Sequence, residues 1–202
     1  MFVALPVALR LLPARFSPLP ALWVAALYCV YVLRRASRSH PVRLWNAEPL
    51  PHSIFSVLAI FALAATAITI AVWMLLPQQM FGFARTHSAF WAVLMVFYPV
   101  FSVYPQGIVF RAFFFERYRP LFPAASAIVL ASAAVFAFSH IIFHNFWSVA
   151  LTFVAGLLFA WRYQKTGSLL VSSLEHALYG CYMFTVGLGG LFYHGAGRTF
   201  IG

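Results

Sequence analysis

Six long apolar runs dominate this chain of 202 residues, and they leave few folds open to it. The runs cover about 18–33, 53–76, 88–110, 122–143, 146–162 and 168–190, and a helix needs roughly 20 mostly apolar residues to cross a bilayer. Only 8% of the residues are charged, whereas a soluble domain carries about 25%. A water-soluble globule is therefore excluded. We predict an all-α fold, a polytopic transmembrane helical bundle of about six spans.

The first twelve residues are apolar, but they are too few and too interrupted to span a membrane. Pro6 and Arg10 break this segment, Pro13 follows it, and no signal-peptide cleavage pattern comes after it. We interpret it as an N-terminal interfacial helix that leads into the first span. No linker is long enough to separate domains, so one structural domain is expected.

The chain is strongly basic, with 13 Lys and Arg residues against three acidic ones and a formal net charge of +10. Many of the basic residues gather in short segments at the ends of apolar runs, at 34–43, 111–119 and 162–165. Such placement is typical of charge that faces the cytoplasm and anionic lipid. Membrane lipid is therefore an expected partner, and nucleic acid is not expected.

Polar side chains inside the apolar runs are the candidates for function, because such groups are costly at membrane depth. Gln106 and Arg111 lie at the third run, His140 in the fourth and His176 in the last. Two of them also have structural explanations. Arg111 could extend its guanidinium to the cytoplasmic surface, and His176 could make a purely structural hydrogen bond.

A metal site is an alternative use of the histidines. His144 lies four residues after His140, so the two share one face if the helix continues. Histidines at this spacing can bind zinc, and His140, His144 and His176 form a weak alternative metal site. An interfacial position near a helix end also explains His144, since Asn145 follows it. No cofactor is otherwise expected.

Three segments, in this order, resemble the motifs of the CPBP family of intramembrane proteases, which covers CAAX proteases, bacteriocin-processing enzymes and the Abi proteins. That family carries Glu-Glu-x-x-x-Arg, Phe-x-x-x-His and His-x-x-x-Asn on separate transmembrane helices. Here residues 106–111 align with the first motif, 136–140 with the second and 176–180 with the third. The resemblance implies that residues 1–87 hold the interfacial helix and two membrane-anchor spans. Residues 88–202 would then form the core that carries the motifs.

The resemblance also implies a mechanism of peptide-bond hydrolysis. In the family, a glutamate and the first histidine activate water, while the second histidine and the asparagine stabilise the oxyanion of the tetrahedral intermediate. Such chemistry needs a base to deprotonate scarce water and donors aimed at the developing charge. The expected catalytic residues are therefore His140, His176, Gln106 and Arg111.

Three motif positions lack the family residue. Gln106 and Gly107 stand where the glutamates are, and Gly180 stands where the asparagine is. Glutamine can orient water but cannot accept its proton, and losing a general base typically costs about 10²–10⁴-fold in rate. Glu175 is a possible substitute acid, although on a helix it points about 100° away from the histidine that follows it. Alternatively, His140 acts as the base itself while Gln106 positions the water.

The depth of these residues in the membrane sets a further condition. Gln106 lies near the end of the third run, whereas His140 lies some 18 residues into the fourth, so upright helices would hold them far apart. They meet only if Pro99 and Pro105 redirect the third helix, or if that span extends to about Tyr118.

Two functions of different classes follow. The first is an intramembrane endopeptidase of the CPBP glutamate/histidine type that acts on a membrane-associated protein substrate, with an activity reduced by the missing glutamates. The alternative is a catalytically inactive CPBP-like membrane protein that binds transmembrane substrates or partners. The resemblance implies a multi-pass integral protein of the bacterial plasma membrane.

Overall fold

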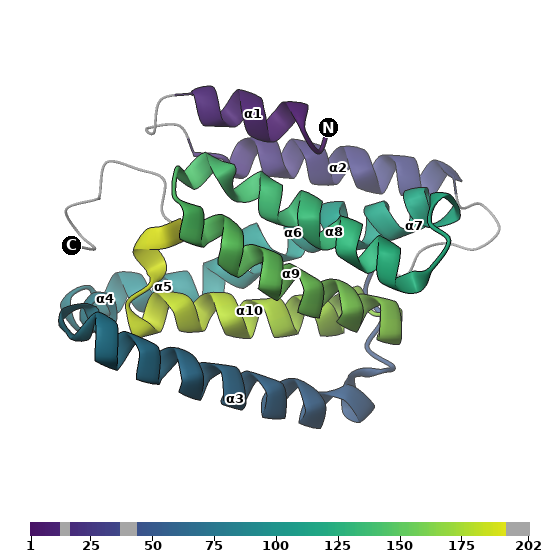
Figure 1. Ribbon diagram of the computed structural model, residues 1–202. Coiled ribbons are helices and arrows are strands. Elements are labelled where there is room, and N and C mark those ends of the chain that lie inside the picture. The colour runs from purple at the N-terminus through teal and green to yellow at the C-terminus, as the bar shows by residue number, and fades with distance from the viewer. Residues whose placement is uncertain (13–16, 37–43, 193–202) are drawn as a thin grey trace.

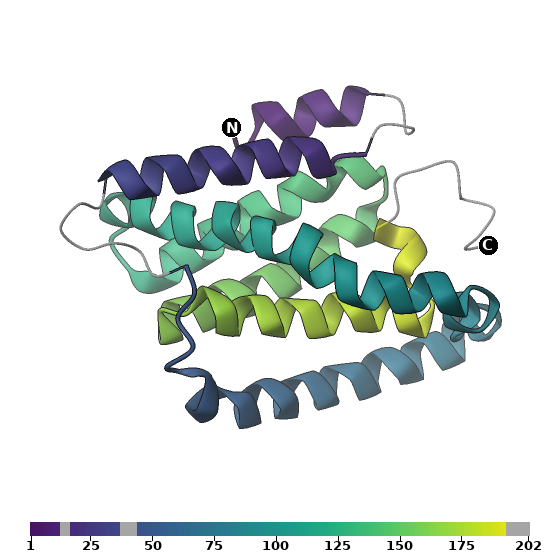
Figure 2. The same ribbon diagram turned by 180° about the vertical axis from the view of Figure 1, so that it is seen from behind.

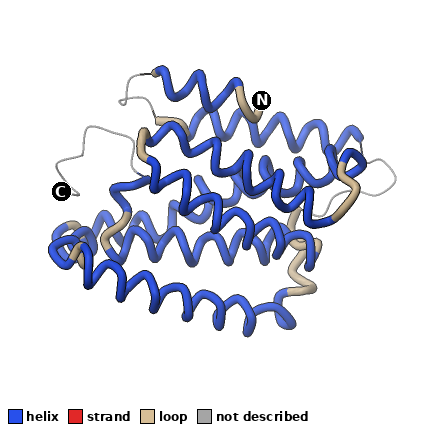
Figure 3. Tube along the Cα trace, viewed as in Figure 1, coloured by secondary structure: helices blue, strands red, loops and turns tan. Residues whose placement is uncertain are grey.

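The computed structural model describes residues 1–12, 17–36 and 44–192, and this part of the chain is helical apart from short connections (Figure 3). The predicted all-α fold is confirmed. Helices α1 and α2 lie along one side of the bundle and α3 along the opposite side (Figures 1 and 2). The α-helices are α1 (Ala4–Leu11), α2 (Leu19–Ala36), α3 (Leu50–Leu75), α4 (Gly82–Thr86), α5 (Ser88–Tyr98), α6 (Tyr104–Gly107), α7 (Phe114–Tyr118), α8 (Ala125–Ser139), α9 (Phe146–Thr166) and α10 (Leu169–Val186).

Four helical stretches are long and apolar enough to cross a membrane: Leu50–Leu75, Ser88–Leu121, Ala125–Phe143 and Phe146–Thr166. The first and last predicted spans correspond to α2 and α10, so all six apolar runs form helices. The count of six spans stays a prediction, as does the division at residue 87. Helix α1 covers the segment predicted to lie at the membrane interface. Pro13 and residues 37–43 of the basic segment 34–43 lie outside the described residues.

The surface of α3 shows how the bundle meets the bilayer. Leu63 and Leu75 are 75% and 77% exposed, and the apolar surface of this helix is largely uncovered by the rest of the protein. Helix α3 packs chiefly on α10, where the Tyr182 hydroxyl donates to the carbonyl oxygen of Ala65 at 3.1 Å. An apolar helix exposed in this way belongs in lipid, which supports an integral membrane protein.

The third span is longer than the sequence predicted. Its helix does not end near residue 110 but continues from Ser88 to Leu121, and it includes the basic residues Arg111, Arg117 and Arg119. Two π-helical segments, Pro99–Val103 and Ile108–Phe113, are built into it. Proline lacks the N–H that an α-helix needs, and a π turn absorbs this defect without ending the helix. Gln106 therefore lies inside the span.

Neighbouring helices satisfy carbonyl groups of both π-helical segments. The indole N–H of Trp23, on α2, donates to the carbonyl oxygen of Phe101 at 3.0 Å. Ser132, on α8, donates through Oγ to the carbonyl oxygen of Phe110 at 2.7 Å. A carbonyl freed from the α-helical pattern needs such a partner at membrane depth. These bonds hold α2 and α8 on either side of the long helix.

A tight connection sets α9 and α10 side by side. Gly167 ends α9 with a φ of +61°, a conformation that favours glycine. Ser168 begins α10, and its Oγ accepts from the backbone N–H of Val171 at 3.1 Å. Further along, Ser172 Oγ donates to the carbonyl oxygen of Phe159 at 2.8 Å. This joint fixes the last motif against α9.

Candidate active site

Arg111 lies in the second π-helical segment with only 1% of its surface exposed. Its guanidinium carbon is 4.3 Å from the centre of the Phe136 ring and 5.3 Å from that of Phe159. The guanidinium therefore does not reach the cytoplasmic surface. It is held against two aromatic rings, whose faces attract a cation. Its Nε and Nη2 atoms have no hydrogen-bond partner among the residues that the structure describes.

His140 is buried at the point where α8 passes into a short 3₁₀ turn, His140–Phe143. Its Nδ1 lies 2.8 Å from the carbonyl oxygen of Phe136, one helical turn earlier. A carbonyl can only accept, so Nδ1 carries the hydrogen and donates it. The neutral ring then has its lone pair on Nε2, which makes this nitrogen the one able to accept a proton.

His176 is buried in the middle of α10 and packs among aromatic rings. Its ring stacks on Phe159, with 4.6 Å between ring centres and an interplanar angle of 23°. Its Nδ1 is buried and has no hydrogen-bond partner. The alternative of a purely structural hydrogen bond through this atom therefore finds no partner among the described residues.

One ring, that of Phe136, brings the three motifs together. Its centre lies 4.7 Å from the His140 ring, 5.4 Å from the His176 ring and 4.3 Å from the guanidinium carbon of Arg111. The Arg111 charge is close enough to both histidines to interact with them electrostatically. Residues from three separate helical segments thus meet at one buried point.

Gln106 lies in α6, and its Nε2 donates to Ser102 Oγ at 2.8 Å. Its Oε1 is buried and finds no hydrogen-bond partner in the described part of the chain. Gln106 and His140 line one cavity of about 120 Å³ beside α1 and α2. The condition set by depth is met because the long helix extends past Tyr118 rather than ending near residue 110.

The next position, Gly107, has no room for a side chain. A Cβ on this residue would lie 2.8 Å from Ser173 Oγ and 2.9 Å from Leu169 Cδ1, both on α10. Helices α6 and α10 therefore approach each other closely here. A side chain at this position would have to displace the ends of the Ser173 and Leu169 side chains.

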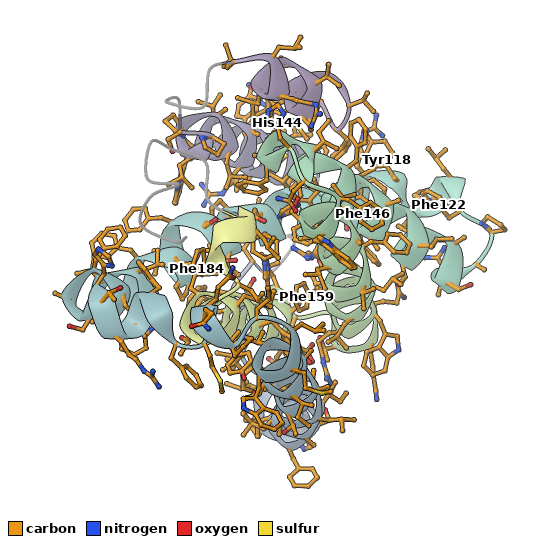
Figure 4. The ribbon with its side chains drawn as sticks, turned by 60° about the vertical axis from the view of Figure 1, so that its left-hand side comes forward. Tyr118, Phe122, His144, Phe146, Phe159 and Phe184 are labelled. Carbon is orange, nitrogen blue, oxygen red and sulfur yellow. The ribbon has the colours of Figure 1, made fainter. Side chains whose placement is uncertain are left out.

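A second and larger cavity, of about 460 Å³, lies between α3, α9 and α10 and reaches His140 and His176. Most of its lining is apolar and includes Ile68, Leu158 and Met183. Phe159, which also lines it, lies near the middle of the bundle in Figure 4. Apolar walls around a few polar groups are typical of ligand sites.

The buried polar atoms that lack a partner gather around the same point. Among the residues that the structure describes, all such side-chain atoms belong to two segments, residues 106–111 and 173–179. Buried polar groups are normally paired, so an unpaired set indicates a place where another molecule binds. The residues concerned are Gln106, Arg111, Ser173, His176 and Tyr179.

Glu175, the possible substitute acid, is paired with Arg162 rather than with either histidine. Arg162 on α9 donates to both of its carboxylate oxygens, through Nε at 2.8 Å and Nη2 at 2.9 Å. The two side chains are 1% and 0% exposed. Arg162 is thus paired inside the bundle rather than exposed, and the side of the membrane on which it lies stays a prediction. The acid role of Glu175 stays a prediction, now with both oxygens engaged.

His144 is not brought together with the other two histidines. It is exposed and follows the 3₁₀ turn with a φ of +57°. Within the described ranges, no three His, Cys, Asp or Glu side chains are placed to hold a metal ion. The alternative metal site of His140, His144 and His176 is therefore not formed in this structure.

Two aromatic residues of the site were not expected from the sequence. Phe159 stacks on His176, and Tyr98 meets the same histidine edge to face, with 6.5 Å between ring centres. The sequence holds 23 Phe and 9 Tyr residues, so type alone could not single out either one. The sequence hint was Gly180, one helical turn after His176, because a glycine leaves space on the helix that another side chain can occupy.

Fold and site together define a helical membrane protein with a buried cluster of one arginine and two histidines. Residues 88–182 match the model of the family described as type II CAAX prenyl endopeptidase Rce1-like. The segment contains all three motifs, and the resemblance to the CPBP proteases is confirmed over it. Comparisons with curated proteins and with solved structures gave no match.

Proposed function

We propose that this protein is an intramembrane endopeptidase that hydrolyses a peptide bond in a membrane-associated protein substrate. The observation that carries this proposal is the meeting of Arg111, His140 and His176 around Phe136, where both histidines line a large apolar cavity. The family match supports the same reaction type. The proposed location is the bacterial plasma membrane.

In the proposed reaction, His140 is the general base. Its Nε2 takes one proton from a water molecule, and the unpartnered Oε1 of Gln106 accepts a hydrogen bond from the other. The water oxygen attacks the peptide carbonyl carbon. The carbon–nitrogen bond then breaks, and the proton held by His140 passes to the leaving amine.

Donors around the cluster stabilise the oxyanion of the intermediate. Nη2 of Arg111 and Nδ1 of His176 are buried without partners, close to the ring that both residues share with His140. Donors held in place in a site that excludes water stabilise developing charge strongly. The apolar cavity favours a substrate with an apolar or lipid-linked segment beside the cleaved bond.

One observation favours a second function, a catalytically inactive protein that binds transmembrane partners. An amide stands at Gln106 where the family has an acid, and Gly107, packed against the side chains of Ser173 and Leu169, supplies no second acid. Such a protein would use the same apolar cavity to hold a membrane segment without cutting it.

Cleavage of membrane-anchored peptides distinguishes the two. Purified protein in lipid bilayers is given fluorescence-quenched peptides with and without an isoprenoid anchor. The wild type should cleave slowly, and His140→Ala and His176→Ala should each lose at least about 100-fold in rate. Gln106→Glu should raise the rate, since it adds an acid beside His140. His144→Asn, at an exposed position outside the cluster, is the matched control and should cleave like the wild type.

Equal cleavage by the wild type and by His140→Ala would refute the proposed endopeptidase. Cleavage by Gln106→Glu alone, with a silent wild type, would support the binding protein instead.

A further inference from the structure

Tyr98 ends α5, directly before the first π-helical segment, and its ring faces the motif residues. It lines the larger cavity together with His140 and His176. Its ring meets His176 edge to face and packs against Phe184 with 5.3 Å between ring centres. The contacts with two neighbours fix the position of the phenol at the wall of the cavity.

Gly180 lies one helical turn after His176 and lines the same cavity. A Cβ on Gly180 would lie 2.3 Å from Cε1 of Tyr98 and 2.4 Å from its hydroxyl oxygen. Real side chains never approach so closely. The end of the tyrosine thus occupies the space into which a side chain at position 180 would extend, and the glycine is what makes room for it.

The hydroxyl of Tyr98 is available to a ligand. It makes no hydrogen bond with any residue that the structure describes, whereas the hydroxyls of Tyr104 and Tyr182 donate to backbone carbonyls. A tyrosine hydroxyl in an apolar setting usually has a partner. The free donor therefore stands at the cavity wall beside His176, which the Tyr98 ring contacts.

We propose that the Tyr98 hydroxyl donates a hydrogen bond to the oxyanion formed during peptide hydrolysis, from the space beside His176 that Gly180 leaves open. This inference rests on the proposed endopeptidase function. The phenol stays protonated throughout: no bond to it forms or breaks, and the proton that moves from water to the leaving amine travels through His140. Tyr98 thus adds an O–H donor to the N–H donors of Arg111 and His176.

The test removes the hydroxyl and keeps the ring. Tyr98→Phe should lower kcat about 10²–10³-fold, the usual effect of removing one oxyanion donor, with KM changed less than about twofold. Tyr182→Phe is the matched control, because it also removes only a tyrosine hydroxyl. That hydroxyl lies on α10 and donates to a carbonyl of α3. An unchanged kcat in Tyr98→Phe would overturn the proposal.

A reciprocal pair of variants tests the shared space. Tyr98→Ala should lose activity, and Tyr98→Ala/Gly180→Asn should recover at least about tenfold in kcat, because the amide then supplies a donor from the other helix. A double variant that folds, as judged by thermal unfolding, and cleaves no faster than Tyr98→Ala would overturn the proposal.

Binding of a transition-state mimic separates this inference from the function itself. A membrane-anchored phosphonamidate peptide presents an anionic tetrahedral centre, and its affinity is measured against that of the parent amide. Tyr98→Phe should bind the mimic at least about tenfold more weakly and the amide equally well. The binding measurement does not require cleavage. A wild type that binds the mimic in this way but does not cleave would count against the proposed function and not against the role of Tyr98. Equal loss for both ligands, or for neither, would count against the role of Tyr98.

Discussion

Arg162 and Glu175 form a buried two-point ion pair between α9 and α10. The same guanidinium donates through Nη1 to Ser56 Oγ on α3 at 2.8 Å. One side chain therefore joins the three helices that enclose the larger cavity. Its effect is on the shape of the site rather than on the reacting atoms.

Removal of the carboxylate should destabilise the bundle. Glu175→Ala leaves a buried guanidinium without its counter-charge, and the expected loss is about 3–5 kcal/mol in the free energy of unfolding. Thermal unfolding in detergent measures it. Glu116→Ala, at an exposed position, should stay within about 0.5 kcal/mol of the wild type. A Glu175→Gln variant of full stability that no longer cleaves would instead mark this residue as the missing acid.

Close packing at Gly107 predicts a cost for even one added methyl group. Gly107→Ala places a Cβ against Ser173 and Leu169, and overpacking of this kind costs about 1–3 kcal/mol. Gly82→Ala is the control, since a Cβ there meets nothing within 4 Å. Unfolding curves of the two variants should therefore separate. Indistinguishable curves would show that α6 and α10 can move apart.

The shared ring of Phe136 should matter more for activity than for stability. Phe136→Leu keeps an apolar side chain but removes the face that holds Arg111 and both histidines, so we expect a loss of about 1–2 kcal/mol in stability and at least tenfold in cleavage rate. Phe115→Leu alters another buried ring, which packs on Tyr163 away from the cluster. It should lose similar stability and keep its cleavage rate. Parallel losses of rate in both variants would argue against a specific role for Phe136.

Asn145 has separable acceptor and donor contacts at the start of α9. Its Oδ1 accepts from the backbone N–H of Ser148 at 2.7 Å, and its Nδ2 donates to the carbonyl oxygens of Leu191 at 2.9 Å and Phe143 at 3.4 Å. Asn145→Ala should cost about 1–2 kcal/mol through loss of the cap. Asn145→Asp keeps the acceptor and loses the donor, so it should recover part of this stability in the same assay. An Asp variant as unstable as the Ala variant would show that the bond to Leu191 dominates.

The helices were predictable because apolar runs near bilayer length have few other uses. The end of the third run was not, since Arg111 and the basic residues after it are typical of a loop. Only the aromatic rings of Phe136 and Phe159, which come from other helices, make a buried arginine at this position tolerable. The ion pair of Arg162 was not predictable either, since its partner lies 13 residues away on the next helix.

The motif residues of the site were predictable in kind and order, whereas their surroundings were not. His140, His176 and Arg111 were selected by the cost of polar groups in lipid, and the structure brings them together. Tyr98 could not be selected that way, because its relation to Gly180 exists only after α5 and α10 have packed. The glycine at position 180 indicates that another side chain can pack there, but it does not indicate which residue does so.

The two π-helical segments also restrict how this protein can change. A π turn holds one residue more than an α turn, and each residue added to or removed from a helix rotates everything beyond it by about 100°. Gln106 and Arg111 face the cluster only because Pro99–Val103 and Ile108–Phe113 contain their present numbers of residues. Substitutions in this stretch keep the register of the helix, whatever they cost in packing. A single insertion or deletion between the two π-helical segments would leave the helix intact and turn Arg111 towards lipid.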